Sequence, residues 1–245
     1  MADTWPEEAS HDFITYGEFF VPDREEHAAA VCAAIPEDIG TGVVLDLCCG
    51  AGGLSASILE SHPDVRVVGL DGSQAMRAAA TDALARFGDR FKAEEFDLGE
   101  GGWRVRWNGC RAIVSSLAVH HLDAGGKQDL FRGIEPMLAP GGLFALVDVI
   151  QPASDASRRI AAAAWDEQVR ARSLERLGDL SAFEAFQRMR WNCYADDAED
   201  DPLDKPSTII EQLTWLVQAG FEGVDLLFAR AGHAVMVGYG ASPIP

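Results

Sequence analysis

Apolar runs alternate with helical stretches along residues 43–150. We expect strands at the apolar runs 43–48, 65–71, 90–97, 110–119 and 143–150. Helices are expected at 54–62, 73–88 and 124–138, the second of them capped by Ser73. Strands that alternate with helices predict a parallel sheet with right-handed crossovers. The near-continuous apolar character of the strands agrees, because such a sheet is covered on both faces.

The end of the chain has a different pattern. Residues 207–220 fit an amphipathic helix, in which Thr208 and Glu211 have the spacing of a capping box. Apolar runs follow at 223–230 and 233–240, separated by two residues. Two strands this close in sequence form a hairpin, so one of them runs antiparallel to the rest. The predicted fold is α/β, with a Rossmann-like, mostly parallel sheet and helices on both faces.

Domain organisation follows from these patterns. Residues 36–150 and 206–245 form the sheet domain. Residues 1–35 form an N-terminal helical cover, with a helix that begins after Pro22. Residues 151–205 form a helical insertion, which we interpret as a lid over a substrate.

The insertion is predicted to hold two helices and an acidic loop. The helices are expected at 156–177 and 180–195, and six of the nine residues in 196–204 are acidic. Such a run is most often a solvated loop. A divalent-metal site is the alternative, although the glycine-punctuated ligand spacing of a calcium loop is absent. We therefore assign no metal ligand.

The amino-acid composition bears on the cellular compartment in which we expect the protein. The chain has 245 residues, of which 48% are hydrophobic and 24% charged, as in ordinary globular proteins. Its apolar runs are too short to span a bilayer, and its acidic start differs from a signal peptide. The five cysteines contain no C-x-x-C pair, which indicates reduced thiols. We expect a cytoplasmic protein without a membrane partner; a homodimer is compatible with the sequence, which does not fix the oligomeric state.

The net charge of the chain indicates whether a nucleic acid is a suitable substrate. The chain has 20 basic and 39 acidic residues, for a net charge of −19. Phosphate backbones are bound by clustered lysine and arginine, so the average surface disfavours a nucleic-acid substrate. A local basic patch stays open, because net charge does not describe where charges lie.

Candidate binding residues follow the predicted strands. In open α/β sheets, ligands bind beyond the carboxyl ends of the strands. Gly50 and Gly52 allow a tight turn and close approach of a ligand, and Asp71 follows about 20 residues later, where a carboxylate can bind both hydroxyls of a ribose. Asp97 suits the amine of a base, and Met76 and Phe96 suit its faces. For Met76, packing in the core is the alternative, because it is apolar and lies inside a predicted helix. Together these residues indicate a nucleoside pocket.

A dinucleotide is the wrong ligand for this turn. Its fingerprint G-x-G-x-x-G would need a third glycine where Ser55 stands. Asp46 also places a negative charge near the turn, which suits an ammonium or sulfonium group rather than a pyrophosphate. The residues therefore favour S-adenosylmethionine.

Five segments of the chain resemble the motifs of a known family. The segments VVLDLCCGAGGLS (43–55), VVGLDGSQAM (67–76), FDL (96–98), AIVSSLAVHHL (112–122) and LAPGGLFALVDV (138–149) are similar, in order, to the motifs of class I S-adenosylmethionine-dependent methyltransferases. The resemblance implies a seven-stranded sheet with one antiparallel strand. One departure is Cys48, where the family commonly has glycine; because cysteine is small, we expect the turn to survive.

The resemblance also implies roles for single residues. It places Asp46 and the 50–53 turn near the methionine part of the cofactor and Asp71 on the ribose. Residues 115–117 would lie beside the sulfonium, and the adenine would contact Met76, Asp97 and Leu98. Tyr16 either folds over the cofactor or packs outside the sheet. The expected cofactor-binding set is Tyr16, Asp46, Cys48, Gly50, Gly52, Asp71, Gly72, Ser73, Met76, Phe96, Asp97, Leu98, Ser115, Ser116, Leu117 and His121.

His120 and His121 are the candidate catalytic pair. They follow the fourth predicted strand, and imidazole accepts protons near neutral pH. An architectural role is the alternative, because a sulfonium is already activated and many methyl transfers need only proximity.

The expected function is methyl transfer from S-adenosylmethionine to an O, N, S or C atom of a small-molecule acceptor, which releases S-adenosylhomocysteine. Two alternatives stay open. One is a cofactor-modifying enzyme of the carboxy-S-adenosylmethionine synthase type, and the other is a non-catalytic module that binds the cofactor.

Overall fold

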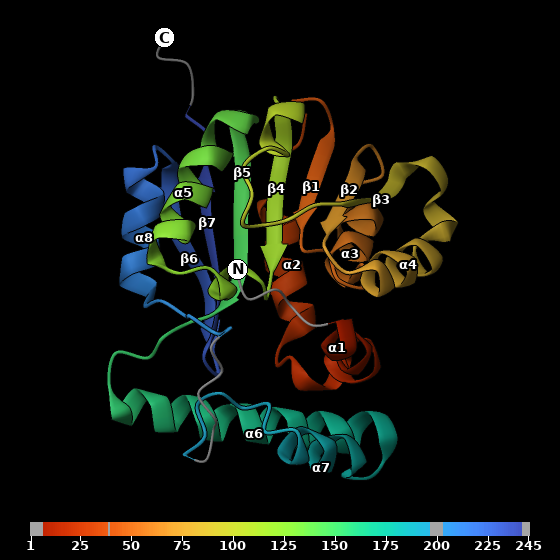
Figure 1. Ribbon diagram of the computed structural model, residues 1–245, viewed down its shortest axis with the longest axis vertical. Coiled ribbons are helices and arrows are strands. Elements are labelled where there is room, and N and C mark those ends of the chain that lie inside the picture. The colour runs from red at the N-terminus through yellow and green to blue at the C-terminus, as the bar shows by residue number, and fades with distance from the viewer. Residues whose placement is uncertain (1–6, 39, 197–202, 242–245) are drawn as a thin grey trace.

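A computed structural model describes residues 7–38, 40–196 and 203–241, and it contains a seven-stranded sheet (Figure 1). The strands are β1 (Val43–Leu47), β2 (Arg66–Asp71), β3 (Phe91–Glu95), β4 (Cys110–Ser116), β5 (Leu138–Val149), β6 (Glu222–Arg230) and β7 (His233–Tyr239). Their order is β3-β2-β1-β4-β5-β7-β6, and β7 is antiparallel to both of its neighbours while the other pairs are parallel. The predicted α/β fold is therefore confirmed.

Helices cover both faces of the sheet. They are α2 (Arg24–Ala34), α3 (Gly53–Ser61), α4 (Gln74–Ala83), α5 (Ala124–Ile134) and α8 (Ile209–Gln218). Because side chains alternate along a strand, Leu45 belongs to one apolar cluster together with Phe131 of α5 and Leu216 of α8. Val44 belongs to a second cluster, together with Val31 of α2 and Ile58 of α3. Four short 3-10 helices complete the domain: Ala85–Arg90, Arg104–Arg106, Val119–His121 (η3) and Glu135–Met137.

Two predicted helix caps are present. The Ser73 hydroxyl oxygen accepts a hydrogen bond from the backbone N–H of Met76 at 3.1 Å, which begins α4. Thr208 and Glu211 form the full capping box at the start of α8. Each cap satisfies N–H groups that a first helical turn leaves without a partner.

Some element boundaries differ from the prediction. The N-terminal segment holds the predicted helix after Pro22, α2, and a separate helix before it, α1 (Glu7–Phe20), which was not predicted. In the insertion, α7 (Ser181–Arg188) ends well before residue 195, and the backbone of Arg190 turns to a φ of 51°.

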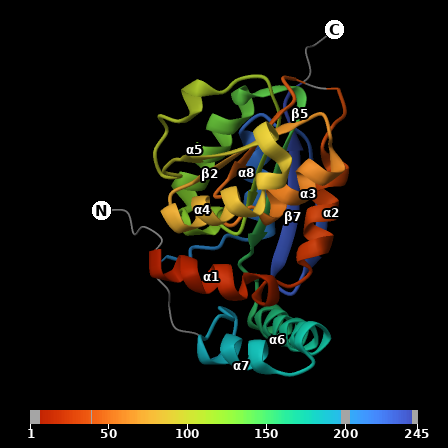
Figure 2. The same ribbon diagram turned by 90° about the vertical axis from the view of Figure 1, so that its right-hand side faces the viewer.

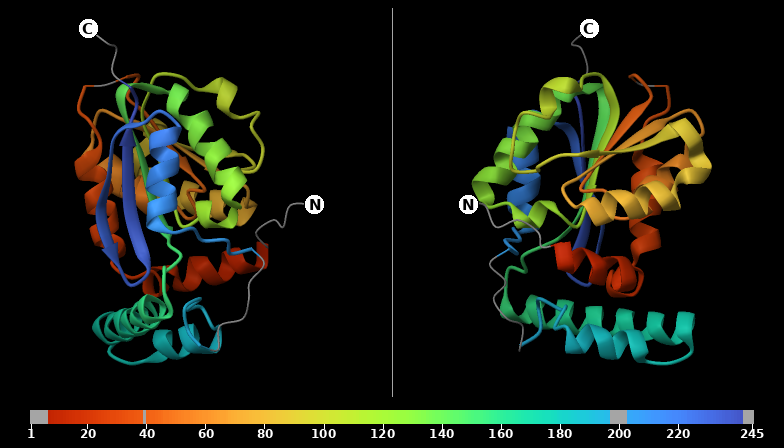
Figure 3. Two further views of the ribbon diagram at one scale, coloured as in Figure 1. Left: turned by 90° about the vertical axis from the view of Figure 1, so that its left-hand side faces the viewer. Right: turned by 45° about the vertical axis from the view of Figure 1, so that its right-hand side comes forward.

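The insertion forms a separate layer beyond the carboxyl edge of the sheet. It consists of α6 (Asp155–Leu177) and α7, and α1 lies between them and the sheet (Figures 1, 2 and 3). The indole N–H of Trp165 donates to the carbonyl oxygen of Phe20 at 2.7 Å, and the Phe20 ring meets the edge of Phe186 at 5.3 Å. An apolar cluster thus fixes α1 to the insertion. Within the residues described, no helix is long and apolar enough to cross a membrane.

Candidate functional site

The strand order reverses between β1 and β4. From β1 the chain proceeds outward to β2 and β3, whereas from β4 it proceeds the other way to β5. The two strands are parallel with Leu47 opposite Ser115, so the turn after β1 and the residues after β4 lie at the same edge. This is where open α/β sheets bind ligands.

Asp71 links the ends of two strands at this edge. Its carboxylate accepts hydrogen bonds from the backbone N–H of Gly50 at 2.8 Å and of Ser73 at 2.9 Å. Burial raises the pKa of Asp71, and the two N–H bonds oppose this rise. Each carboxylate oxygen can accept a further hydrogen bond, so the group can still bind a pair of hydroxyls.

The turn before α3 contains three residues with positive φ. A Cβ on Gly50 (φ 54°) would meet, of the described atoms, only the sulfur of Met76 within 4 Å, at 3.9 Å. A Cβ on Gly52 (φ 84°) would instead lie 2.8 Å from Leu84, so this glycine permits helix packing. Cys48 adopts a φ of 55°, as a glycine would, and the turn is preserved. Room for a close ligand therefore lies at Gly50.

Asp46 is deeply buried and has a partner within the protein. The hydroxyl of Ser55 donates to its carboxylate at 2.6 Å. Burial raises the pKa of Asp46 to about 7, against the opposing effect of the Ser55 hydrogen bond. The side chain thus ties the end of β1 to the first turn of α3.

The residues expected at a base gather beside Asp71. The backbone N–H of Phe96 donates to the carbonyl oxygen of Asp71 at 3.4 Å, and the buried Phe96 ring packs edge-on against Trp103. Leu98 packs on the same apolar cluster. Asp97 is exposed, and its carboxylate accepts a hydrogen bond from Gly99 at 2.8 Å.

Gly72 lies in the same region. A Cβ there would be 3.4 Å from the carbonyl oxygen of Phe96. The structure thus brings the predicted residues of the second and third motifs together.

The end of β4 contributes backbone and small side chains. The hydroxyl of Ser115 donates to the carbonyl oxygen of Leu47 at 2.9 Å and so joins β4 to β1. Ser116 and Leu117 are half-buried, and Leu117 has a φ of 57°. Tyr16 of α1 stacks on Phe20 at 5.2 Å, and Tyr16 and Leu117 pack against the same apolar cluster.

The N-terminal helix reaches from the insertion to the start of α4. A carboxylate oxygen of Glu7 accepts a hydrogen bond from the backbone N–H of Ala75 at 2.7 Å. The guanidinium of Arg24, in α2, lies against Gly53 at the start of α3. Helix α1 thus lies between the insertion and the carboxyl edge of the sheet (Figure 2).

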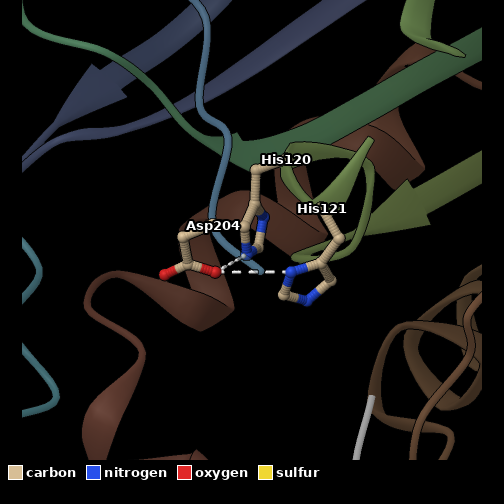
Figure 4. Close-up of side chains that lie close together, drawn as sticks. All are labelled: His120, His121 and Asp204. Atoms are coloured by element: carbon tan, nitrogen blue, oxygen red, sulfur yellow. Dashed lines mark ion pairs between the residues drawn. The ribbon is translucent and has the colours of Figure 1, made fainter. Parts of the chain in front are cut away.

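Two histidines and a distant carboxylate converge beyond β4 (Figure 4). His120 Nδ1 lies 2.5 Å from Asp148 Oδ1, and its Nε2 lies 3.4 Å from Asp204 Oδ1. His121 Nδ1 lies 3.3 Å from the same Asp204 oxygen. Burial disfavours the charged ring of His120, but Asp148 and Asp204 outweigh it and raise its pKa to about 10.

Sequence reasoning missed Asp204 as a site residue. It belongs to the run 196–204, which was expected to be a solvated loop; residues 197–202 lie outside the described structure. The pKa of Asp204 is lowered, because hydrogen bonds from both histidines outweigh its burial. The segment is held in place by a hydrogen bond from Lys205 N to the carbonyl oxygen of His120 at 2.8 Å. Only the metal-site alternative for the acidic run pointed toward this contact.

Comparison with known proteins places residues 44–142 in a family described as "Methyltransferase domain". An uncharacterized methyltransferase of Synechocystis sp. is 33% identical over 112 residues, which are 45% of this chain and 49% of that protein. A ribosomal RNA small subunit methyltransferase H of Prochlorococcus marinus is 49% identical over 61 residues, 24% of this chain and 20% of that protein. The chain thus spans half or less of the length of these curated relatives.

Solved structures agree on the fold. PigF with S-adenosylhomocysteine superposes with a TM-score of 0.60 and 17% identity, covering 96% of this chain and 59% of that one. An O-methyltransferase family 2 protein of Planctomyces limnophilus in complex with apigenin gives a TM-score of 0.59 and 16% identity. The superposition covers 97% of this chain and 62% of that one. At such low identity the likeness concerns the fold alone.

The motif order, the sheet topology and the matched family agree. The chain therefore contains a class I S-adenosylmethionine-dependent methyltransferase domain, and S-adenosylmethionine is the cofactor of that family.

Proposed function

We propose that this protein transfers the methyl group of S-adenosylmethionine to a small-molecule acceptor. The observation that carries the proposal is the Asp71 carboxylate, held by Gly50 and Ser73 at the point where the strand order reverses. A fixed carboxylate in that position is suited to the two hydroxyls of a ribose.

The residues around Asp71 fit the rest of the cofactor. The open space at Gly50 admits a ligand close to the backbone. Met76, Phe96 and Leu98 offer apolar surface to an adenine, and Asp97 offers an acceptor to its amine. When bound, S-adenosylmethionine supplies a methyl group on a positively charged sulfur, and transfer of this group to an acceptor releases S-adenosylhomocysteine.

The chain's own residues then position the acceptor. Ser115, Ser116 and Leu117 line the end of β4, and Tyr16 and the insertion lie across this edge. Alignment of the attacking atom with the methyl group is the main requirement, because the leaving group is already activated. A cover of helices also limits the access of bulk water to the reacting groups.

A small acceptor is supported by the cover and by the charge. The net charge of −19 opposes a long phosphate backbone. The structural neighbour from Planctomyces limnophilus is in complex with apigenin, and its likeness in fold supports a small molecule as the acceptor of this chain. The matches to the ribosomal RNA enzyme are short, but they make RNA the rival acceptor.

The test is incubation with S-adenosylmethionine and a panel of phenols, carboxylic acids, amines and thiols, read by mass. We expect one acceptor to gain a methyl group and S-adenosylhomocysteine to accumulate. A carboxylated cofactor formed with prephenate would favour the cofactor-modifying alternative. Binding without turnover against the whole panel would favour the non-catalytic module, and an RNA complex that persists at physiological salt would overturn the small acceptor.

The histidine pair gives the proposal a mutational test. Replacing His121 by alanine is expected to lower turnover at least about a hundredfold, the usual effect of losing a group that handles the acceptor's proton. The matched control is His11→Ala, which removes an exposed imidazole of α1. Initial rates within threefold of wild type for His121→Ala would reject a catalytic role for this residue.

A further inference from the structure

The cluster of His120, His121 and Asp204 has the composition of a metal site. Each residue offers one ligand atom, and these atoms all lie within 4.8 Å of one another. The cluster is the one such group of three found in the part of the chain that the structure describes. Two imidazoles and one carboxylate are the donor set that iron, zinc and similar ions take in open sites.

The spacing of the donors fits a common ion. The Asp204 oxygen lies 3.4 Å from His120 Nε2 and 3.3 Å from His121 Nδ1. Metal–nitrogen and metal–oxygen bonds of ~2.0–2.2 Å at angles near 90–110° put neighbouring donors ~2.8–3.6 Å apart. Two of the three donor pairs therefore already have the separation that an ion would impose.

The second imidazole nitrogen of His120 is oriented as in metal proteins. Its Nδ1 faces Asp148 Oδ1 at 2.5 Å, and that same oxygen accepts a hydrogen bond from Val149 N at 2.9 Å. Asp148 is fully buried at the end of β5. A carboxylate behind a ligating histidine fixes the tautomer and turns the other nitrogen toward the ion. This arrangement aims Nε2 of His120 at Asp204 (Figure 4).

The ligands come from elements that are held in place. His120 and His121 lie on η3, directly after β4. Asp204 lies in the segment that returns from the insertion, which is anchored by Lys205 N on His120 and by the buried Lys127 ammonium on Ser207 Oγ at 2.9 Å. The cluster thus joins the sheet domain to the returning insertion.

We propose that His120 Nε2, His121 Nδ1 and Asp204 Oδ1 bind a divalent transition-metal ion, with its remaining positions open to the methyl acceptor. The site is proposed from its ligands, but its role rests on the proposed function. An acceptor hydroxyl on the ion loses its proton to water; the oxygen then bonds to the methyl carbon as the carbon–sulfur bond breaks, and its electron pair stays on sulfur. A metal-bound nitrogen accepts no proton, so this assignment replaces the general-base role of the pair.

A plain ion pair between the histidines and Asp204 is the rival interpretation. The test is a titration of the chelator-treated protein with Co²⁺ alone, followed by calorimetry and visible absorption. We expect one equivalent to bind, with d–d bands of nitrogen and oxygen ligation. Asp204→Asn, which keeps the side-chain shape, and His121→Ala are expected to weaken binding at least about tenfold. Asp148→Asn, a change in a positioning residue, is expected to weaken it ~10–100-fold.

The control variant is His11→Ala, which should bind Co²⁺ as wild type does. Circular dichroism and unfolding midpoints confirm that each variant is folded. No saturable uptake by the wild type, or equal uptake by Asp204→Asn, would overturn the metal site. Methyl transfer in a protein that takes up no Co²⁺ overturns the site and leaves the proposed function standing. Co²⁺ binding without any methyl transfer supports the site and contradicts the proposed function.

Discussion

At the scale of single residues, the two glycines of the β1 turn have different tasks. Gly50 leaves space open toward a ligand, whereas Gly52 lets Leu84 approach the backbone. The sequence motif predicts both as binding residues, because it contains no information on which neighbour fills the place of each missing side chain. The contact with Leu84 is long-range packing, which the local pattern does not encode.

This difference predicts the effect of Gly52→Ala on stability. The added Cβ would meet Leu84 at 2.8 Å at a φ of 84°, so we expect a loss of about 2 kcal/mol or more in the free energy of unfolding. The matched control is Gly102→Ala, where the structure places nothing described within 4 Å of the added Cβ. Urea unfolding of both variants checks this, and equal midpoints would refute the packing role.

Asp204 shows where single-residue prediction fails. Its partners His120 and His121 lie more than eighty positions earlier in the chain. The neighbouring contact between His121 and Leu203, the residue before Asp204, spans 82 positions. Asp71, in contrast, was predictable because its partners Gly50 and Ser73 belong to ordered local motifs. Contacts made by a returning insertion depend on tertiary packing and leave no periodic signal.

At the scale of elements, the docking of α1 on the insertion determines what covers the carboxyl edge. The alternation of strands and helices was predictable because each element has its own apolar pattern. Helix α1 was not predicted as separate, because its aromatic residues pack against Trp165 and Phe186 of a segment far along the chain. Its end before Pro22 agrees with the restriction that proline imposes on the residue before it.

The indole hydrogen bond of Trp165 should be a measurable part of this docking. Trp165→Phe leaves the buried carbonyl of Phe20 without its donor, so we expect unfolding to become easier by about 1–3 kcal/mol. Trp103→Phe is the control, because the indole N–H of Trp103 is buried with no partner among the described residues. Denaturant unfolding compares the two, and a smaller loss in Trp165→Phe than in the control would contradict the account.

At the scale of the whole molecule, acid sensitivity should arise partly from neutral buried histidines. Burial lowers the pKa of His27 to about 4 and that of His233 to about 3. His27 packs edge-on against Phe228, and neither of its ring nitrogens has a hydrogen-bond partner among the described residues. The unfolded chain binds protons on these rings near pH 6.5, whereas the folded protein does not until the lower pKa is reached.

The sign of the effect follows from this difference. Between pH ~6.5 and 4 the unfolded state holds more protons, so each such histidine lowers stability by up to ~1.4 kcal/mol per pH unit as the pH falls. In His27→Phe one of these contributions is absent. The stability of the variant relative to wild type should therefore rise as the pH falls from ~6.5 to 4. Urea midpoints across this range measure it, and a difference that does not change with pH would contradict the burial argument.

The whole-molecule architecture was largely predictable, since the order of elements and the antiparallel hairpin follow from local patterns and handedness rules. The position of the insertion relative to the sheet was not, because it depends on an apolar cluster assembled from segments far apart in the chain. That cluster decides which groups lie near an acceptor.

Calorimetric titration of the protein with S-adenosylhomocysteine tests the central claim most directly, with Asp71→Ala beside the wild type. The wild type should bind one equivalent, and the variant should bind at least about tenfold more weakly, because a charged acceptor of hydroxyl hydrogen bonds is lost. Asp82→Ala, an exposed carboxylate on α4, is the matched control and should bind as wild type does. No heat with the wild type, or unchanged binding by Asp71→Ala, would contradict the account.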